Sequence, residues 1–279
     1  MFSKMWTTKY TKQDLLRWIN EADRIIVGAG SGLSAAAGVA YSGPEFEKEF
    51  ADFIARYGFT DLYSSSFYPY PTPEEFWACW AKHIDYIRYK QDAKPLYKAL
   101  RDLLIDKPHF VITTNVDGQF RKAGFNPAKL FEVQGDYAYM QCSKACHDKL
   151  YYNENLVKEM VAKTKDCRIP SELVPVCPVC GEPMAVHVRT DEYFIQNEEW
   201  DKAYQAYASF LDGSQGKNTL LIELGVGFNT PSIIRFPFDA MAKNNRNFTL
   251  VRVNKNDEGA FFENHCAIKV KEDIARLIL

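Results

Sequence analysis

Four short apolar runs constrain the fold of this chain more than any other feature of its sequence. They are RIIVGAG (24–30), HFVITT (109–114), NTLLIEL (218–224) and FTLVRVN (248–254). Each run is nearly continuous in aliphatic or aromatic residues, which is typical of strands buried on both faces of a parallel sheet. Segments with helical patterns lie between them. This alternation predicts an α/β fold built on a Rossmann-like, doubly wound parallel sheet.

Helix starts can be located from their capping residues. Thr11 is a suitable N-cap for the segment KQDLLRWI, with Asp14 in the first turn. Thr72 is a second N-cap, with Pro73 at the first helical position and Glu75 placed to complete a capping box. The apolar residues that follow at helical spacing are Phe76, Trp80, Ile84 and Ile87. Further helices are expected in NEEWDKAYQAYASFL and KEDIARLIL.

Two segments without clear strand signals divide the chain. Residues 41–94 are expected to be helical, and residues 136–190 are polar and contain five of the seven cysteines. A chain of 279 residues suits one large domain that carries a smaller one. We therefore expect a large domain of residues 1–40, 95–135 and 191–279, and a small discontinuous domain of residues 41–94 and 136–190 that combines the helices with a metal module.

Composition excludes several classes of function. The formal net charge of -2 argues against a nucleic-acid-binding protein. No apolar run is long enough to cross a bilayer, and the segment MFSKMWTTKYTKQDLL lacks the apolar core of a signal peptide. Seven cysteines without such a signal favour a reducing, cytoplasmic location, where thiols more often bind metals or catalyse reactions than form disulfides.

The loop after the first strand has the composition of a phosphate-binding turn. In VGAGSGLSAAAGV, glycines let backbone N–H groups approach a pyrophosphate at a helix N-terminus, and serines can add hydroxyl donors. The candidate dinucleotide-binding residues here are Gly28, Ala29, Gly30, Ser31, Gly32 and Ser34. An ordinary strand-to-helix turn is the competing interpretation. Hydride transfer is not favoured, because the acidic residue that dehydrogenases place about twenty residues further on has no counterpart in PEFEKEF.

Polar residues also follow the other predicted strands, at the sheet edge where open α/β sheets bind ligands. The segments are TTNVDG, LGVGFNTP and the residue after VRV. Their candidate site residues are Asn115, Asp117, Gly225, Gly227, Asn229 and Asn254. Because several strand ends carry amide, carboxylate or glycine groups, the sequence favours a nucleotide-binding crevice.

The cysteine spacing predicts a metal site. Cys142 and Cys146 form one pair, and Cys177 and Cys180 form a second in the segment CPVCGEPM. Four thiolates suit a closed, structural zinc site. The alternatives are a redox Cys-x-x-Cys motif, unrelated buried thiols, or His147 as a ligand in place of Cys146. The three remaining cysteines are interpreted as ordinary thiols: Cys79, Cys167 and Cys266.

Taken in order, these motifs resemble the sirtuin family across nearly the whole chain. GSGLSAAAGV is similar to the family's Gly-Ala-Gly-x-Ser…Gly-Ile loop, TTNVDG to its Thr-Gln-Asn-Ile-Asp motif, and VQG stands where the family has His-Gly. The cysteine pairs, GVG and VRVN occupy the matching later positions. The resemblance implies that NAD is a co-substrate bound between the large domain and a zinc-bearing small domain, and that its nicotinamide–ribose bond is cleaved.

The departures from the family are as informative as the matches. Ala40-Tyr41-Ser42-Gly43 replaces the usual Pro-Asp-Phe-Arg, and VHVRTDEYFI contains no counterpart of the Phe-Gly-Glu strand that pairs with acyl-lysine peptides. Gln134 replaces the base histidine. In these respects the chain resembles the macrodomain-linked (class M) sirtuins. That resemblance implies a protein mono-ADP-ribosyltransferase that acts on a lipoyl-carrier protein and is functionally linked to a macrodomain ADP-ribosyl hydrolase.

The chemistry favours the same interpretation. A carboxamide cannot take up a proton at neutral pH, whereas deacylation needs a base to activate a ribose hydroxyl. By the resemblance, Asn115 orients the nicotinamide ribose, Asp117 holds the carboxamide of NAD and Gln134 binds the ribose hydroxyls. Asp136 is the candidate proton acceptor for the incoming nucleophile. The alternatives are a lysine deacylase that uses water or Asp136 as base, an NAD hydrolase, and a pseudoenzyme that only binds NAD.

Overall fold

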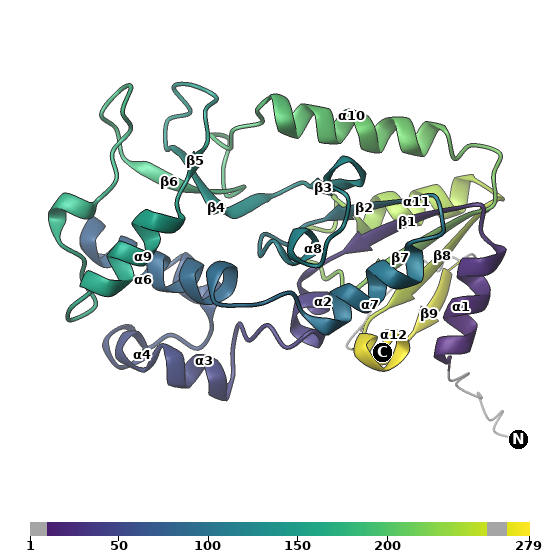
Figure 1. The fold of residues 1–279 in the computed structure, drawn as a ribbon, viewed down its shortest axis with the longest axis horizontal. Helices are drawn as coiled ribbons and strands as arrows, with labels where there is room; N and C mark the ends of the chain where they lie inside the picture. The colour runs from purple at the N-terminus through teal and green to yellow at the C-terminus, as the bar shows by residue number, and fades with distance from the viewer. Residues whose placement is uncertain (1–9, 256–266) are drawn as a thin grey trace, which may run out of the picture.

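The core of the protein is a parallel β-sheet. The computed structural model describes residues 10–255 and 267–279. Its larger sheet has six strands in the order β3-β2-β1-β7-β8-β9, and all neighbouring strands are parallel (Figure 1). The strands are β1 (Arg24–Ala29), β2 (His109–Thr113), β3 (Leu130–Glu132), β7 (Thr219–Leu224), β8 (Phe248–Val253) and β9 (Ala267–Val270). The predicted α/β sheet is confirmed, with short strands β3 and β9 in addition to the four predicted ones.

Helices cover both faces of this sheet because alternate strand residues point to opposite sides. Ile25 and Val27 belong to the core that includes α1 and α7, whereas Ile26 belongs to the core that includes α11. The helices of the first layer are α1 (Lys12–Glu21), α2 (Ser31–Ala36), α7 (Pro95–Leu104) and α12 (Ile274–Ile278). Those of the second are α10 (Glu198–Asp212) and α11 (Arg235–Asn244). The short helices α8 (Gln119–Lys122) and η2 (Pro127–Lys129) follow β2.

A smaller unit lies beside the sheet (Figure 1). Its first insertion holds α3 (Pro44–Glu49), α4 (Ala51–Tyr57), α5 (Leu62–Ser66), α6 (Pro73–Ile84) and the π-helix η1 (Asp85–Tyr89). Its second holds β4 (Gly135–Cys142), β5 (Tyr151–Tyr152), α9 (Glu154–Lys163), η3 (Ser171–Leu173) and β6 (Met184–Val188). The strands form an antiparallel sheet in the order β5-β4-β6. Both insertions contribute to one hydrophobic core, which supports the proposed two-part small domain.

The predicted helix starts are present, with one difference in detail. The backbone N of Thr11 donates to Asp14 Oδ2 (2.9 Å), and Thr72 Oγ1 accepts from the backbone N of Glu75 (3.3 Å). The predicted capping box at Glu75 is wrong. Its carboxylate accepts instead from Arg56 Nη2 (3.1 Å) and the Tyr57 hydroxyl (2.8 Å). A buried carboxylate gains more from a cation than from one backbone amide, so the tertiary contact prevails.

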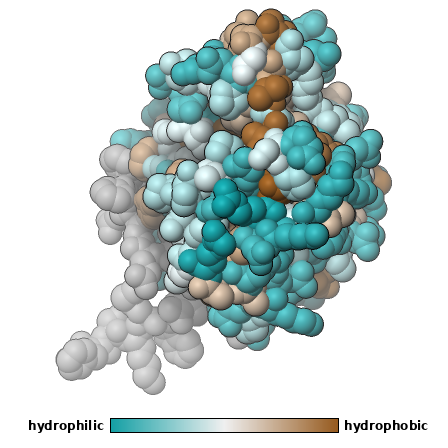
Figure 2. Space-filling view, turned by 90° about the vertical axis from the view of Figure 1, so that its left-hand side faces the viewer, coloured by the Kyte–Doolittle hydropathy of each residue, from teal (hydrophilic) through white to brown (hydrophobic). Residues whose placement is uncertain are grey.

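The surface of the small-domain end is mainly hydrophilic, with a narrow hydrophobic strip across it (Figure 2). Within residues 10–255 and 267–279, no helix combines the length and apolar character needed to span a bilayer.

Candidate active site

A buried hydrogen-bond network lies at the carboxyl ends of β1 and β2. Asn115 Nδ2 lies 3.0 Å from the carbonyl oxygen of Gly30, 3.2 Å from Ser34 Oγ and 3.3 Å from the Tyr97 hydroxyl. The Ser34 hydroxyl donates to Asp117 Oδ2 at 2.5 Å. The side chains of the network are buried, so their hydrogen bonds are shielded from water and fix their orientations. The structure thus joins the glycine loop to the TTNVDG motif.

Asp117 is held by donors from both sides. Its Oδ1 accepts from the backbone N of Gln119 (3.0 Å), in addition to the hydroxyl of Ser34 on Oδ2. Burial raises the pKa of the Asp117 carboxyl above its ordinary value, and these two hydrogen bonds oppose the rise. The carboxyl is therefore fixed in one direction, as a group that positions a ligand must be.

The glycine loop packs against the loop after β7 through backbone atoms. The N of Gly32 donates to the carbonyl oxygen of Gly225 (3.0 Å). A Cβ on Gly30 would lie 2.7 Å from that oxygen, and a Cβ on Gly32 would lie 2.7 Å from the Gly225 Cα. Gly225 itself has φ +60, a conformation that favours glycine. Any side chain at these positions would push the two loops apart, so the glycines are required for the loop contact.

The other predicted nucleotide-binding residues have varied surroundings. A Cβ on Gly28 would lie 2.5 Å from Ile234 Cγ2, so this glycine makes room for α11 and does not face the loop. Asn254 Nδ2 donates to the carbonyl oxygen of Val226 (3.3 Å). Ala29 is buried in the core under the sheet. The remaining three are exposed around the loops: Ser31, Gly227 and Asn229.

Gln134 lies in a tight turn between β3 and β4. The carbonyl oxygen of Val133 accepts from Trp200 Nε1 (3.1 Å), and that of Gln134 accepts from the backbone N of Arg189 (3.0 Å). Gly135 has φ +97, and a Cβ there would collide with the carbonyl oxygen of His187. Among the residues that the structure describes, the half-buried Gln134 side chain has no hydrogen-bond partner. Its donors and acceptor are therefore available to a ligand.

Arg189 also lies at the Gln134 turn, and the sequence did not point to it. Its guanidinium lies over the Phe194 ring, with 4.5 Å from Cζ to the ring centroid, and near the Trp200 ring at 5.7 Å. Its Nε is buried without a partner in the described parts of the chain. Burial lowers the pKa of this guanidinium. An unused, buried donor beside the Gln134 turn suits a ligand with an oxygen acceptor. The only signal in the sequence is the arginine that precedes the aromatic pair Tyr193-Phe194.

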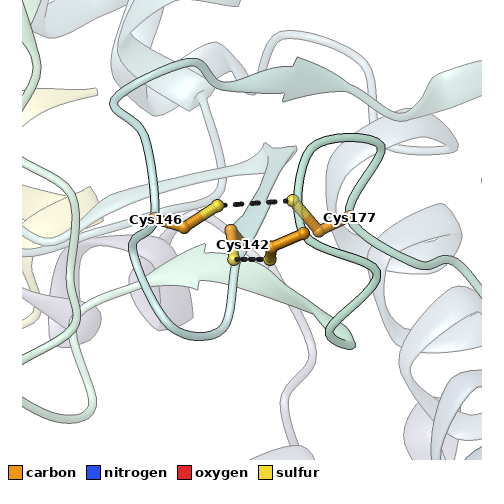
Figure 3. A group of neighbouring side chains, drawn as sticks. Cys142, Cys146 and Cys177 are labelled. Carbon is orange, nitrogen blue, oxygen red and sulfur yellow. Dashed lines mark hydrogen bonds between the residues drawn. The ribbon is translucent and has the colours of Figure 1, made fainter.

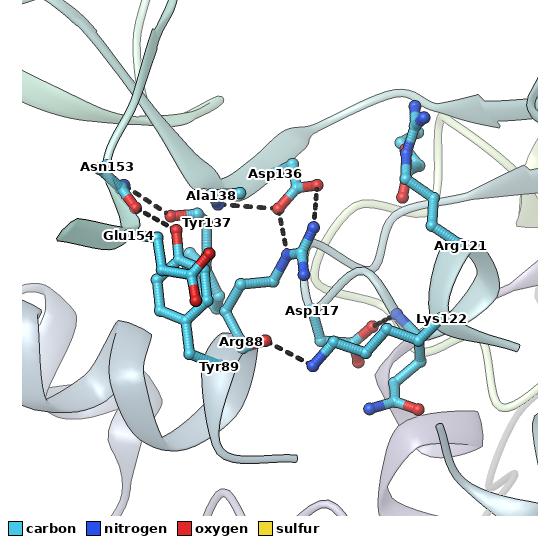
Figure 4. Close-up of polar contacts among 12 residues, drawn as sticks. Arg88, Tyr89, Asp117, Arg121, Lys122, Asp136, Tyr137, Ala138, Asn153 and Glu154 are labelled. Carbon is cyan, nitrogen blue, oxygen red and sulfur yellow. Dashed lines mark hydrogen bonds and ion pairs between the residues drawn. The ribbon is translucent and has the colours of Figure 1, made fainter. Parts of the chain in front are cut away.

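Asp136 is already engaged by an arginine (Figure 4). Its Oδ1 accepts from Arg88 Nε (2.8 Å) and from the backbone N of Ala138 (2.8 Å), and its Oδ2 accepts from Arg88 Nη2 (3.1 Å). Both side chains are largely buried, with 14% of the Arg88 side chain and 9% of the Asp136 side chain exposed. With its oxygens occupied by three donors, Asp136 is badly placed to accept a proton from an incoming nucleophile. The contact favours a positioning role over the predicted role as proton acceptor.

Glu132 brings a third carboxyl group to the same region. It ends β3, two residues before Gln134, and its side chain accepts from Arg121 Nε (2.6 Å). Burial and, secondarily, the Asp136 carboxylate raise the pKa of Glu132 to about 7, although Arg121 acts in the opposite direction.

Because this folded-state pKa lies above the ordinary value, Glu132 should make stability depend on pH. A raised carboxyl pKa stabilises the folded form below about pH 4.5, and this stabilisation is lost as the pH rises through about 7. Glu132→Gln should remove this loss, on the order of 2 kcal/mol between pH 5 and 8. Urea unfolding of both proteins at the two pH values measures the difference. Equal losses in wild type and variant would contradict the assignment.

The four predicted zinc ligands converge, and Figure 3 labels three of them, Cys142, Cys146 and Cys177. The Sγ atoms of Cys142, Cys146, Cys177 and Cys180 all lie within 4.8 Å of one another. The separations Cys142–Cys180 and Cys146–Cys177 are both 3.6 Å. Tetrahedral zinc with sulfur ligands at about 2.3 Å separates its sulfurs by roughly 3.8 Å, so the cluster fits this ion.

The neighbouring residues complete the description of this cluster. His147 Nδ1 lies 3.0 Å from Cys146 Sγ, so it stands beside the cluster and does not displace that cysteine from it. Cys79 and Cys167 are buried and free, away from the four sulfurs. Cys266 lies outside the described residues.

Comparison with known proteins identifies the family. The model of the Sir2 family matches residues 30–209. A Staphylococcus aureus protein named "Protein ADP-ribosyltransferase" is 37% identical over 248 residues, which cover 88% of this chain and 79% of that protein. A Fusarium oxysporum f. sp. cubense protein named "Probable bifunctional ADP-ribose hydrolase/ADP-ribosyltransferase" is 31% identical over 252 residues; the match covers 86% of this chain and only 42% of that protein.

Solved structures support the same fold. A structure of Sir2 bound to an acetylated peptide aligns with a TM-score of 0.59 at 22% identity, and covers 95% of this chain and 94% of its own. The family model spans well over half of the sequence, and the bacterial relative is 37% identical over the 248 aligned residues. This chain therefore belongs to the Sir2 family.

Proposed function

We propose that this protein is an NAD-dependent protein mono-ADP-ribosyltransferase. It would cleave the nicotinamide–ribose bond of NAD and transfer ADP-ribose to a protein side chain. The observation that carries the proposal is the turn at Gln134. Its carboxamide has no hydrogen-bond partner among the described residues, and it stands where the resemblance places a base histidine. The buried network around Asn115 and Asp117, which the resemblance assigns to NAD, is intact in the same site.

The reaction can proceed without a base at this turn. Nicotinamide leaves with the electron pair of its bond to the ribose carbon, and the acceptor's nucleophile supplies the pair for the new bond and releases its proton to water. Asn115 would orient the ribose, and Asp117 would hold the carboxamide of NAD. Gln134 would bind the ribose hydroxyls, and Arg189 would donate to an oxygen of the ligand. Deacylation, by contrast, needs a base to activate a ribose hydroxyl.

The relatives support the finer parts of the proposal to different degrees. The name of the Staphylococcus relative supports ADP-ribosyl transfer. That of the Fusarium relative, which joins a hydrolase to a transferase, supports assignment to the macrodomain-linked sirtuins and a functional link to an ADP-ribosyl hydrolase. A lipoyl-carrier protein as acceptor rests on the resemblance to that class alone. The free cysteines of the described chain support a reducing, cytoplasmic location, and the four-sulfur cluster supports structural zinc.

The acceptor can be sought directly. Wild-type protein is incubated with NAD labelled in its adenylate half and with a lysate of its own source, and labelled proteins are separated and identified. We expect one or a few labelled proteins, with no label when the transferase is omitted. Formation of free ADP-ribose without any labelled protein would contradict the transferase assignment and favour an NAD hydrolase.

Gln134→Ala should slow nicotinamide release about five- to a hundred-fold. The variant loses one or two hydrogen bonds to the ligand, worth roughly 1–3 kcal/mol, and loses no proton acceptor. The shape of the pH–rate profile should not change. A loss above about 10³-fold, together with a missing limb in the pH profile, would indicate that the residue takes part in proton transfer.

Gln134→His should not produce a deacylase. An imidazole has one nitrogen on each side of the ring, so it cannot reproduce the two donors and the carbonyl oxygen of an amide. The segment after β6 also contains no described strand for pairing with a peptide, since residues 189–197 are irregular. The assay is release of acyl-ADP-ribose from an acyl-lysine peptide. Its appearance only in the variant would show that one side chain separates the two reactions.

A further inference from the structure

Arg88 links three segments that the sequence keeps far apart (Figure 4). It belongs to the π-helix η1 of the small domain, its guanidinium pairs with Asp136 at the start of β4, and it also contacts the loop after β2. We propose that Arg88 and Asp136 act as a positioning pair, which holds the small domain against the Gln134 turn and the Asp117 loop in the geometry needed for NAD cleavage. This inference rests on the proposed function, and it replaces the predicted proton-acceptor role of Asp136.

The contact with the Asp117 loop is made at Gly118. This residue has φ +69, and a Cβ on it would lie 2.6 Å from both Cζ and Nε of Arg88. The guanidinium therefore packs directly on the backbone that follows Asp117. A side chain at position 118 would displace the arginine, so the glycine of the VDG motif serves the ion pair as well as the turn.

The backbone around Arg88 is fixed from both sides. Lys122 Nζ donates to the carbonyl oxygen of Arg88 and to that of Gln91. The Tyr89 hydroxyl donates to Asn153 Oδ1 (2.5 Å) at the start of α9. The π-helical turn closes with a bond from the N of Lys90 to the carbonyl oxygen of Asp85 (2.7 Å). Such turns occur often at functional sites, and here the turn directs consecutive side chains to two different partners.

The burial of the pair explains why it should control geometry. Asp136 stands two residues after Gln134, and with the Ala138 amide it fixes the first residues of β4. Removing one member would leave the other charge buried and unpaired, which is more disruptive than removing both. In a positioning pair, the effects of changing the two members should therefore not add. The effect of removing a general base should instead add to the effect of removing a neighbour.

A double-mutant cycle distinguishes these roles. The variants are Arg88→Gln, Asp136→Asn and the two combined, and the readouts are NAD affinity and kcat for nicotinamide release between pH 6 and 9. We expect each single change to lower kcat about 10- to 100-fold, and the double change to cost no more than the worse single change. The shape of the pH profile should stay that of the wild type. Arg88→Lys keeps the charge but loses the bidentate geometry, so its kcat should lie between those of the wild type and Arg88→Gln.

A different pattern would overturn the proposal. If Asp136 were a base, Asp136→Asn would remove a limb of the pH profile, and its effect would multiply with that of Arg88→Gln. Glu75→Gln is the control, because it breaks the pair of a buried carboxylate with the partly exposed Arg56 elsewhere in the small domain. Thermal unfolding gives the folded fraction of each variant. If the activity of the cycle variants falls only in proportion to this fraction, as expected for the control, the pair has a structural role alone.

The test also separates this inference from the proposed function. If the wild type releases no nicotinamide, the proposed function fails, and the coupling is then read from NAD affinity alone. Additive effects on NAD affinity would overturn the positioning pair in that case as well.

Discussion

Asn115→Ala is expected to lower the rate of nicotinamide release by at least about 10²–10³-fold, with little change in NAD affinity. A preorganised donor or acceptor aimed at developing charge contributes mainly in the transition state, so its loss appears in kcat. In the structure, three contacts orient the Asn115 amide, to Gly30, Ser34 and Tyr97. The Ser34–Asp117 contact does not involve Asn115, so part of the network should survive the change.

The measurement is single-turnover nicotinamide release together with NAD binding by calorimetry. Asn126→Ala is a suitable control, since the hydrogen bond described for Asn126 Oδ1 is one from the backbone N of Ala128 at the start of η2. The control should keep wild-type turnover. Turnover of Asn115→Ala within a few-fold of wild type would show that this motif is a structural turn and that the site is wrongly assigned.

Loss of the metal is expected to unfold the small domain and abolish activity. The antiparallel sheet there has three strands, and β5 has only two residues, so few backbone pairs hold the sheet together. Cys142 ends β4, the strand that begins at Gly135 directly after Gln134. The free energy of metal binding at such a site is in effect free energy of folding. We therefore expect chelation, or Cys177→Ser, to disorder this strand and with it the active-site turn.

Elemental analysis should find one zinc per chain in protein purified without chelator. Limited proteolysis after chelation should then cut within residues 136–190 before it cuts the large sheet. Cys79→Ser and Cys167→Ser should keep the metal, because neither cysteine belongs to the cluster. Absence of zinc from the untreated protein, or full activity of the stripped protein, would contradict the proposed structural role.

Much of this architecture could be predicted from local sequence. The buried strands have continuous apolar runs, the loops at their ends have glycines, and the cysteines have metal-site spacing. The short strands β3 and β9 were missed because three or four residues carry no recognisable period. The local sequence suggests a capping box at Glu75. It cannot show the contacts of Glu75 with Arg56 and Tyr57, because these depend on how α4 packs on α6.

The two arginines near the Gln134 turn could not be predicted from the sequence. Arg88 comes from the helical insertion, and Arg189 follows a strand in the second insertion. Both reach the Gln134 turn only through tertiary structure, and neither belongs to a motif in the sequence. The sequence identifies Asp136 as a candidate but not Arg88 as its partner. The predicted role of Asp136 as proton acceptor therefore leaves out the ion pair that occupies its carboxylate.

The fate of the ADP-ribose group tests the proposed function most directly. Wild-type protein receives adenylate-labelled NAD, a lysate of its own source and an acetyl-lysine peptide in one reaction, and the label is followed into protein, free ADP-ribose and acyl-ADP-ribose. We predict nicotinamide release with label on protein, none on the acyl product, and neither with Asn115→Ala. Robust formation of acyl-ADP-ribose by the wild type would contradict the transferase assignment and establish a deacylase.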